Sequence, residues 1–410
     1  MTLTIDHIGS GGDGVARTDA GPVFVPGALP GETVEVEIED GRGRLLRVIE
    51  QSPDRVPIQS EAYAQSGVAP LQLWASAPYL IWKRDQVMRA LAQERLETDV
   101  ETIVACPPGT RRRIALHARR LPDGKVVLGF KARRSWTVIP LEHCPLSDPR
   151  LNAALPALAR VAAPFLSGSK SAPTLHVTAT DTGLDVDVTG VERRTRSADV
   201  NQRAIRAALE ADLARLSLDG NPLVVQRTPL IRFGPATVAI PPGAFLQASP
   251  KAEAAMAERT VAAVTGARKA ADLFCGAGTF SFPLAQVATV VAADSSVAGI
   301  EAMRAAVRTA PGLKPITAEV RDLFRRPLSP QDLKGCEAVV FDPPRAGALE
   351  QSRQIALSGA STVVGVSCNP TTFARDARVL ADAGFRLDAV TPVDQFLWST
   401  HIELVGVFRR

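Results

Sequence analysis

This 410-residue chain has no stretch that approaches the roughly 20 uninterrupted apolar residues of a transmembrane helix. Its first residues, MTLTIDHIGSGGDG, lack the basic and apolar regions of a secretory signal. The five cysteines are odd in number and follow no regular spacing, so they do not suggest a disulfide framework. These absences favour a protein of the reducing cytoplasm that spans no membrane.

A strong charge of one sign is also missing. The 47 Lys and Arg residues face 43 Asp and Glu residues, which leaves a net charge of +4. Such a balance is compatible with nucleic-acid binding, but it indicates binding only where the cations cluster. Apolar residues make up 46% of the chain, enough for substantial cores. At this length we expect two or three domains, and the sequence divides into three segments.

The segment 1–52 is predicted to be a small all-β domain. Turn signals such as GSGGDG and DGRG separate its strand-like runs TLTIDHIG, GPVFVPGAL, ETVEVEIED and RLLRVIEQ. Short strands with glycine turns predict an OB-like barrel, a fold that often binds RNA. A small β domain of another purpose is the alternative.

The segment 53–245 is predicted to mix α and β structure, and it contains a cluster of cations. The run GTRRRIALHARRLPDGKVVLGFKARRSWTVI alternates like two strands around a PDG turn. Its cations are Arg111, Arg112, Arg113, Arg119, Arg120, Lys125, Lys131, Arg133 and Arg134, and Asp123 is the one acid among them. Such a surface could contact several RNA phosphates, although most charge runs are only solvated faces.

The segment 246–410 alternates strand-like and helix-like runs. The strand-like runs include ARKAADLF, TVVAAD, EAVVFD, STVVGVS and THIELVGVF. Alternation of this kind predicts βαβ units and a parallel sheet, with ligands bound at the carboxyl ends of the strands.

The run ADLFCGAGTFSFPLA predicts a cofactor site. Gly276 and Gly278 form a tight turn after a strand, where glycine lets the backbone approach a ligand closely. Asp294 ends the next strand and could accept the hydroxyls of a ribose, and Asp322 follows a third short segment. The third glycine of the dinucleotide fingerprint is missing. A nucleoside cofactor without a pyrophosphate, such as S-adenosylmethionine, is therefore favoured over an NAD-type cofactor.

Two further loops carry chemically useful side chains. Asp342 ends a strand and precedes two prolines that stiffen its loop, so it could orient a flat substrate such as a base. Cys368 follows the run STVVGVS and precedes Asn369-Pro370, where a thiolate could be presented to a substrate. A free cysteine is more often a small buried apolar residue, and we expect that of Cys106, Cys275 and Cys336.

The segments FLQASP, DLFCGAGTFSFPLA, FDPPRAG, VSCNPTTFARD and DQFLWSTHIELV together resemble the RNA 5-methyluridine methyltransferase family. Members of this family methylate C5 of uridine in tRNA or 23S ribosomal RNA. The resemblance covers the last 165 residues. The N-terminal barrel is similar to the TRAM domain of the family, and WKRDQV with the arginine-rich sheet resembles its central RNA-binding domain. The implied fold is α/β: a Rossmann-like class I methyltransferase domain after an OB-like barrel and a central α+β domain.

The resemblance also implies roles for individual residues. Cys368 would add to C6 of uracil, and C5 would then take the methyl group of S-adenosylmethionine. Glu403 would remove the C5 proton, and Asp342 would lie near the uracil. The residues that would bind the cofactor are Gln247, Phe274, Gly276, Thr279, Asp294, Asp322 and Asp342. Asp294 stands where many relatives have Glu, and Thr279 where many have Asn.

The chain departs from the family pattern at its iron–sulfur ligands. Many members hold a four-iron cluster through C-x5-C-x2-C and a later cysteine. Here Glu61, Gly67 and Pro70 occupy the first three positions, and only Cys144 remains. One thiolate cannot hold such a cluster, so we expect no metal.

The expected partner is a structured RNA, bound by a monomer. An RNA-binding protein or chaperone that keeps the fold without turnover is one alternative, and a methyltransferase for another base is a second. The presence of Cys368, Glu403 and Asp342 argues against the first. Methylation of an amino group needs no covalent cysteine, which argues against the second.

Overall fold

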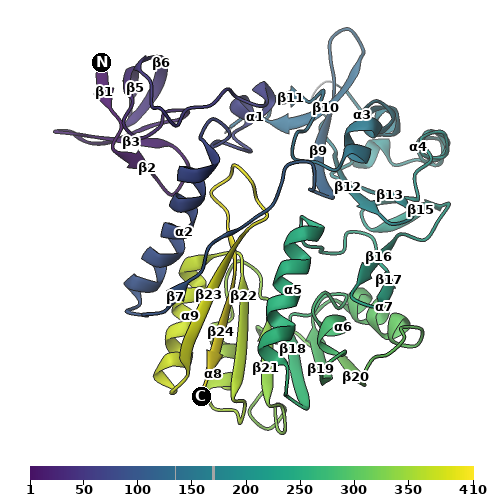
Figure 1. Ribbon diagram of the computed structural model, residues 1–410. Helices are drawn as coiled ribbons and strands as arrows, with labels where there is room; N and C mark the ends of the chain where they lie inside the picture. The colour runs from purple at the N-terminus through teal and green to yellow at the C-terminus, as the bar shows by residue number, and fades with distance from the viewer. Residues whose placement is uncertain (134, 169–170) are drawn as a thin grey trace.

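The computed structural model describes residues 1–133, 135–168 and 171–410. Two β-rich units, formed by the N-terminal and central parts of the chain, lie side by side, and the C-terminal α/β unit lies below them (Figure 1). Among the helices of the described residues, none combines the length and apolar character that crossing a membrane would require.

The N-terminal unit is a six-stranded sheet that curls around a small apolar core. Its strands are β1 (Thr2–Thr4), β2 (His7–Ile8), β3 (Gly14–Thr18), β4 (Gly21–Val25), β5 (Thr33–Glu39) and β6 (Arg42–Glu50). They pair in the order β1-β5-β6-β4-β3-β2. Alternate residues such as Leu3, Val34 and Val36 are buried in its core, as the period of a half-buried strand requires.

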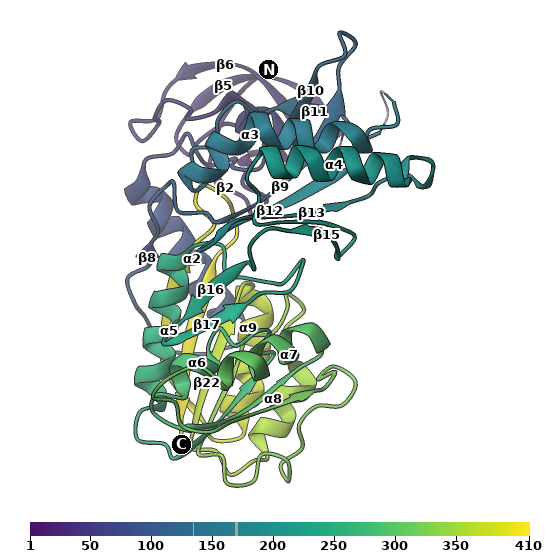
Figure 2. The same ribbon diagram turned by 90° about the vertical axis from the view of Figure 1, so that its right-hand side faces the viewer.

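The central unit is a seven-stranded sheet with helices on one face (Figure 2). The strand order is β11-β10-β9-β12-β13-β14-β15. The strands are β9 (Arg113–Arg120), β10 (Val126–Lys131), β11 (Val138–Pro140), β12 (Thr174–Thr180), β13 (Gly183–Thr189), β14 (Arg215–Leu218) and β15 (Asn221–Val225). Helices α3 (Pro149–Ala162) and α4 (Ala198–Glu210) cover the apolar face, and Leu116, Leu158 and Leu175 are fully buried between the layers.

The C-terminal unit contains the predicted parallel sheet. The strands are β18 (Lys269–Leu273), β19 (Thr289–Asp294), β20 (Ile316–Val320), β21 (Ala338–Phe341), β22 (Thr362–Ser367), β23 (Arg386–Asp394) and β24 (Glu403–Arg409). They pair in the order β20-β19-β18-β21-β22-β24-β23, with β24 antiparallel to both neighbours. The connecting helices are α5 (Pro250–Val264), α6 (Ser281–Leu284), α7 (Val297–Val307), α8 (Leu349–Ala356) and α9 (Pro370–Asp382).

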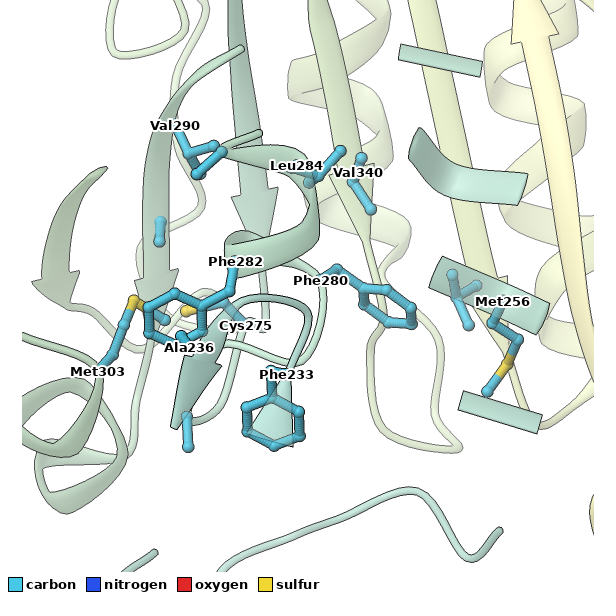
Figure 3. Close-up of a cluster of buried hydrophobic side chains, with 14 of the residues drawn as sticks. Phe233, Ala236, Met256, Cys275, Phe280, Phe282, Leu284, Val290, Met303 and Val340 are labelled. Carbon is cyan, nitrogen blue, oxygen red and sulfur yellow. The ribbon is translucent and has the colours of Figure 1, made fainter. Parts of the chain in front are cut away.

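Both faces of this sheet are buried, as expected for parallel strands that read as continuous apolar runs. Figure 3 shows one of the two cores, in which Phe233, Phe280 and Phe282 gather near the sheet. Cys106, Cys275 and Cys336 are buried in these cores, which confirms the expectation for them.

Part of the predicted central segment packs on the C-terminal sheet. Helix α2 (Ser76–Gln93) lies against α9, and the short strands β7 (Asp99–Val100) and β8 (Val104–Ala105) pair with β23. They cover an edge strand whose backbone groups would otherwise be unpaired. The hairpin β16 (Leu230–Phe233) and β17 (Ala236–Ala239) also packs into the core in Figure 3. Elements of the predicted central segment thus contribute to the C-terminal unit. The domain boundaries at residues 52 and 245 stay a prediction.

Candidate active site

The sheet brings four predicted residues to one rim. Parallel β21 lies between β18 and β22, so the loops that begin at Phe274, Asp342 and Cys368 leave the same edge. Antiparallel β24 pairs Leu404 with Ser367, and this register places Glu403 opposite Cys368. Residues that are distant in the sequence thus meet where ligands bind in sheets of this kind.

Cys368 lies immediately before α9, whose first turn is well defined. The side chain of Asn369 accepts a hydrogen bond from the Thr371 N–H at 3.1 Å, and Pro370 occupies the first helical position. Cys368 is half-buried and lines a cavity of about 150 Å³ together with Arg345. Burial raises the pKa of its thiol to about 11, and the charges of the neighbouring carboxylates add to this shift. In the absence of a substrate, the side chain of Cys368 is therefore a neutral thiol at neutral pH.

The two carboxyl groups beside Cys368 both titrate near neutral pH. Glu403 is only 3% exposed, and burial together with the charge of Asp342 raises its pKa to about 8. Burial raises the pKa of Asp342 to about 7, although an N–H of Gln247 stabilises its charged form. Values in this range suit groups that exchange protons during a reaction at neutral pH.

Two buried glutamines connect these carboxyl groups. The Gln247 amide donates to Asp342 Oδ2 at 3.0 Å. The Gln395 amide donates to Gln247 Oε1 and to Glu403 Oε1, both at 2.8 Å. Sequence reasoning identified Gln247 but missed Gln395, because a polar residue after a strand usually reads as an exposed loop residue. Its position between an apolar strand and a second apolar segment was the one available signal.

The predicted cofactor residues Phe274, Gly276 and Asp294 lie together at the carboxyl ends of β18 and β19. Asp294 accepts hydrogen bonds from the Gly276 N–H at 2.9 Å and the Ser296 N–H at 2.7 Å. Phe274 has a φ of 61° and packs on Phe324, with 5.4 Å between ring centroids.

The two glycines of the turn have different surroundings. A Cβ on Gly278, at a φ of 105°, would lie 2.5 Å from the ring of Phe282, which Figure 3 shows in the core. A Cβ on Gly276 would meet no atom within 4 Å, so the backbone here borders open space. This open turn, between an aromatic ring and carboxylates, fits the nucleoside part of S-adenosylmethionine.

Two other predicted cofactor residues lie differently. Asp322 is half-buried and accepts a hydrogen bond from the Phe324 N–H at 3.0 Å, which places it beside the aromatic pair. Thr279 instead lines a groove of about 740 Å³ beside α5, together with Phe233 and Pro283. The structure thus brings Asp322 to the candidate cofactor site and places Thr279 at a neighbouring groove.

The residues around Cys144, where many family members would hold an iron–sulfur cluster, do not fit such a cluster. The Tyr63 hydroxyl lies 2.7 Å from the Cys144 sulfur, and the Ser147 hydroxyl donates to that sulfur at 2.9 Å. Within residues 1–133, 135–168 and 171–410, no group of three or more His, Cys, Asp or Glu side chains is placed to hold a metal ion. A phenol and a hydroxyl thus satisfy the one remaining thiol of the family set.

The structure corrects the prediction for Arg112. This side chain is buried, forms an ion pair with Glu253 of α5, and donates to the carbonyl oxygen of Gln247 at 3.0 Å. It therefore joins the central unit to the backbone of a predicted cofactor residue, and it does not face the surface.

Arg111 and Arg113 line cavities between the central sheet and the segment after β23. The guanidinium of Arg111 lies 5.8 Å from the ring centre of Phe396, and that of Arg113 lies 5.7 Å from Phe245. Burial lowers the pKa of Arg113 to about 10, with further lowering by neighbouring arginines, so it stays charged at neutral pH.

The remaining predicted cations of this sheet are spread over its surface. Lys131 lies 4.1 Å from the ring centre of Trp136, and the Arg119 guanidinium donates to the Trp136 carbonyl oxygen at 3.1 Å. Arg120 instead donates to the carbonyl oxygen of Ala163, and Arg133 forms an ion pair with Asp13 of the N-terminal unit at 2.9 Å. Arg134 lies outside the described residues.

Comparison with protein families gives two matches. Residues 239–410 match the family model described as tRNA (Uracil-5-)-methyltransferase. Residues 1–47 match the TRAM domain model, in agreement with the prediction for the N-terminal barrel.

Individual relatives extend over the whole chain. The sequence is 56% identical over 412 residues to an uncharacterized RNA methyltransferase of Caulobacter vibrioides, covering 100% of this chain and 99% of the relative. A Brucella suis protein of the same description is 43% identical over 409 residues, covering 100% of this chain and 97% of the relative. A 23S rRNA (uracil(1939)-C(5))-methyltransferase of Yersinia enterocolitica is 29% identical over 431 residues, with 100% and 95% covered.

A solved structure shows the same fold over its full length. It is that of Pyrococcus abyssi tRNA (uracil-54, C5)-methyltransferase in complex with S-adenosyl-L-homocysteine, with a TM-score of 0.76 and 23% sequence identity. The match covers 100% of both chains. The class I methyltransferase fold predicted from the sequence is thereby confirmed.

Proposed function

The chain belongs to the S-adenosylmethionine-dependent RNA (uracil-5-)-methyltransferase family, and from this premise we propose that it methylates C5 of a uridine through a covalent bond between Cys368 and C6. The observation that carries the proposal is the register of β22 and β24, which sets Glu403 opposite Cys368 with Asp342 beside them. We further propose that the enzyme acts as a monomer in the cytoplasm.

The covalent step solves a problem of reactivity. C5 of uracil is a poor nucleophile, but addition of the Cys368 sulfur to C6 moves electron density onto C5 and the C4 carbonyl. Bound S-adenosylmethionine supplies an electrophilic methyl group. C5 takes that methyl group and then carries both the methyl group and its original proton.

Glu403 completes the cycle. In its ionised form, which a pKa of about 8 makes the minor form at neutral pH, one oxygen of the carboxylate removes the C5 proton. The electron pair of that C–H bond re-forms the C5–C6 double bond. The Cys368–C6 bond breaks, and sulfur leaves as a thiolate. The thiol gives its proton to solvent before addition and takes one back from solvent after release, so atoms and charges balance. Burial of Glu403 suits this role because a carboxylate that is poorly solvated is a stronger base than one in water.

Asp342 orients the uracil. The prolines after it fix its loop, and Gln247 binds one of its oxygens at 3.0 Å. The other lone pairs can accept the N3–H of a uracil, which would place C6 over Cys368 on the adjacent strand end. The target uridine must leave its stack to reach this rim, at a cost of a few kcal/mol.

The RNA around the target would lie on the solvent-facing side of the central sheet. Residues 113, 115, 117 and 119 point to that side, because successive residues of a strand alternate between its faces. Arg113, Arg119 and Lys131 supply positive charge there, and the exposed rings of Phe245 and Trp136 can stack on unpaired bases. The substrate would be 23S rRNA or tRNA, the RNAs named for the Yersinia and Pyrococcus proteins.

The chemistry is tested with two variants. The Glu403→Gln variant is incubated with RNA and methyl-labelled S-adenosylmethionine. Its Cys368 should add to C6 of the uracil and the methyl group should be transferred to C5, but the product should not be released. The labelled RNA should then stay attached to protein during denaturing electrophoresis. Cys368→Ser should bind cofactor yet form neither product nor complex. Wild-type turnover by Cys368→Ser would exclude the covalent mechanism, and retained RNA binding without methyl transfer by the wild type would support an RNA-binding protein.

The substrate is identified by position-mapped nucleoside mass spectrometry of tRNA and rRNA from a deletion strain. Loss of 5-methyluridine at one position names the RNA. A complete set of 5-methyluridines in that strain would contradict the proposed activity.

A further inference from the structure

The side chain of Gln395 is buried, at 5% exposure, and its amide NH₂ donates to Gln247 and Glu403 of the candidate active site. It follows β23 directly, while Glu403 begins β24, and these strands pair Val393 with Glu403. The glutamine is therefore the first residue beyond β23, two positions after the residue that pairs with the proposed base.

A backbone group determines how the Gln395 amide is oriented. The Ala248 N–H, which can only donate, points at Gln395 Oε1 at 2.9 Å. The NH₂ of Gln395 must then face Gln247 and Glu403, where it donates to both. This in turn sets the Gln247 oxygen toward Gln395 and its NH₂ toward Asp342. One N–H thus determines the orientation of the whole chain of amides.

This arrangement leaves the two oxygens of Glu403 in different states. Oε1 accepts from Gln395, whereas Oε2 is buried and has no hydrogen-bond partner among the described residues. A buried oxygen without a donor is costly, and such groups in native proteins call for an explanation. Here the free lone pair is the one available to take a proton.

We propose that Gln395 is a positioning residue that holds Glu403 by one oxygen, leaves the other free as the base, and couples the base to Gln247 at the cofactor side. The inference rests on the proposed function, since it assigns a role within that reaction. It adds a residue that touches neither the reacting uracil atoms nor the methyl group, yet controls the step in which product is released.

The pH dependence of product release is the readout that a merely structural role would not change. The ionisable groups whose charges act at this point are Asp342 from the end of β21 and Cys368 from the end of β22. The N–H of Gln395 stabilises the charged form of Glu403 and so lowers its pKa from what burial alone would give. Without that N–H, Glu403 should ionise only at higher pH.

The test uses Gln395→Met, which keeps the length of the side chain but removes its N–H donors. Under single-turnover conditions methyl transfer should proceed, while release of methylated RNA should slow by roughly ten- to a hundredfold, the range for a hydrogen bond to a charged group. The covalent complex should accumulate, and the pH profile of release should move to higher pH. Gln395→Glu, which keeps the acceptor for Ala248 but loses a donor to Glu403, should show the same defect and provides a second test if the first variant does not fold.

The matched control is Gln351→Met. Gln351 is an equally buried glutamine that binds the backbone of Leu328 on the far side of the sheet, so its loss should affect stability but not the pH profile of release. A wild-type release rate and pH profile in both Gln395 variants would overturn the positioning role. Failure of the proposed function would look different, because Glu403→Gln would then form no covalent complex at all.

Discussion

A neutral thiol and two carboxyl groups that titrate near neutral pH face each other at the reacting centre. Burial is the first cause of all three shifts, and the negative charges of neighbouring carboxylates add to the shifts of Cys368 and Glu403. A site of this kind resists carrying several negative charges at once. In the proposed reaction, the Cys368 thiolate would therefore form in the substrate-bound state, where the developing charge can pass to the uracil.

The raised pKa of Glu403 has a consequence for stability. The folded protein keeps this carboxyl protonated up to about pH 8, whereas an unfolded chain releases the proton near the ordinary value of 4.5. Between these pH values the folded state binds more protons, so this group lowers the free energy of unfolding as pH rises. Glu403→Gln cannot ionise and should lose less stability between about pH 5 and pH 8, by about 1 kcal/mol or more.

Chemical denaturation at several pH values measures this difference. Glu350→Gln, at an exposed carboxylate of α8, is the control and should follow the wild type. If the free energy of unfolding changes with pH in the same way for the wild type and Glu403→Gln, Glu403 is already ionised in the folded protein at pH 5.

Individual residues also show where sequence reasoning failed and why. Arg112 was grouped with its neighbours by charge, although the alternation of Ile114, Leu116 and Ala118 already indicated that even-numbered positions face the core. The period of the strand should have outweighed the charge at that position. Gln395 gave a weaker signal, because its burial depends on Gln247 and Ala248, which are far away in the sequence.

Among the secondary-structure elements, α2 holds the loop between β23 and β24 from one side. Lys83 of α2 is fully buried, forms an ion pair with Asp394, and donates to the carbonyl oxygens of Phe396 and His401 at 3.0 and 2.6 Å. Tyr79, one turn earlier, accepts a hydrogen bond from the Trp398 N–H at 2.8 Å. This helix thus fixes the loop that follows Gln395.

Removing one partner of this buried pair should be costly. Lys83→Met leaves Asp394 as an uncompensated buried charge and should destabilise the protein by about 3–5 kcal/mol. The double variant Lys83→Met, Asp394→Leu removes both charges and should recover much of that loss. Urea denaturation of the two variants measures both free energies of unfolding, and a double variant no more stable than Lys83→Met would contradict the coupling of the pair.

The strands that form the rim were predictable, and the strands that cover the sheet edge were not. Runs such as TVVAAD and STVVGVS are apolar over their full length, which is typical of parallel strands buried on both faces. The strands β7 and β8 have two residues each, too few to show a period. Their pairing with β23 depends on the fold of the C-terminal unit and could not be read locally.

For the whole molecule, the three units are joined by ion pairs, one of which lies beside Gln247 of the candidate active site. Arg133 binds Asp13 between the central and N-terminal units, and Arg112 binds Glu253 between the central and C-terminal units. The loop after β23, drawn in yellow, rises from the catalytic sheet toward the central unit in Figure 1. A base delivered to the rim would therefore contact residues from more than one unit, as a substrate turned out of a folded RNA requires.

The contribution of the central sheet to RNA binding can be measured through salt dependence. Replacing Arg113, Arg119 and Lys131 with Gln removes positive charge from the solvent-facing side, and it leaves the buried Arg112–Glu253 pair intact. RNA affinity should fall, and the slope of log K against log salt should decrease by up to about 0.9 for each phosphate that the variant no longer neutralises. Affinity for S-adenosylmethionine should not change.

A matched triple variant replaces three exposed cations of the C-terminal unit, Arg268, Arg353 and Arg386. It changes the net charge equally and should retain the wild-type slope. If both triple variants lower the slope by the same amount, the protein attracts RNA through its overall charge, and the central sheet is only a solvated face.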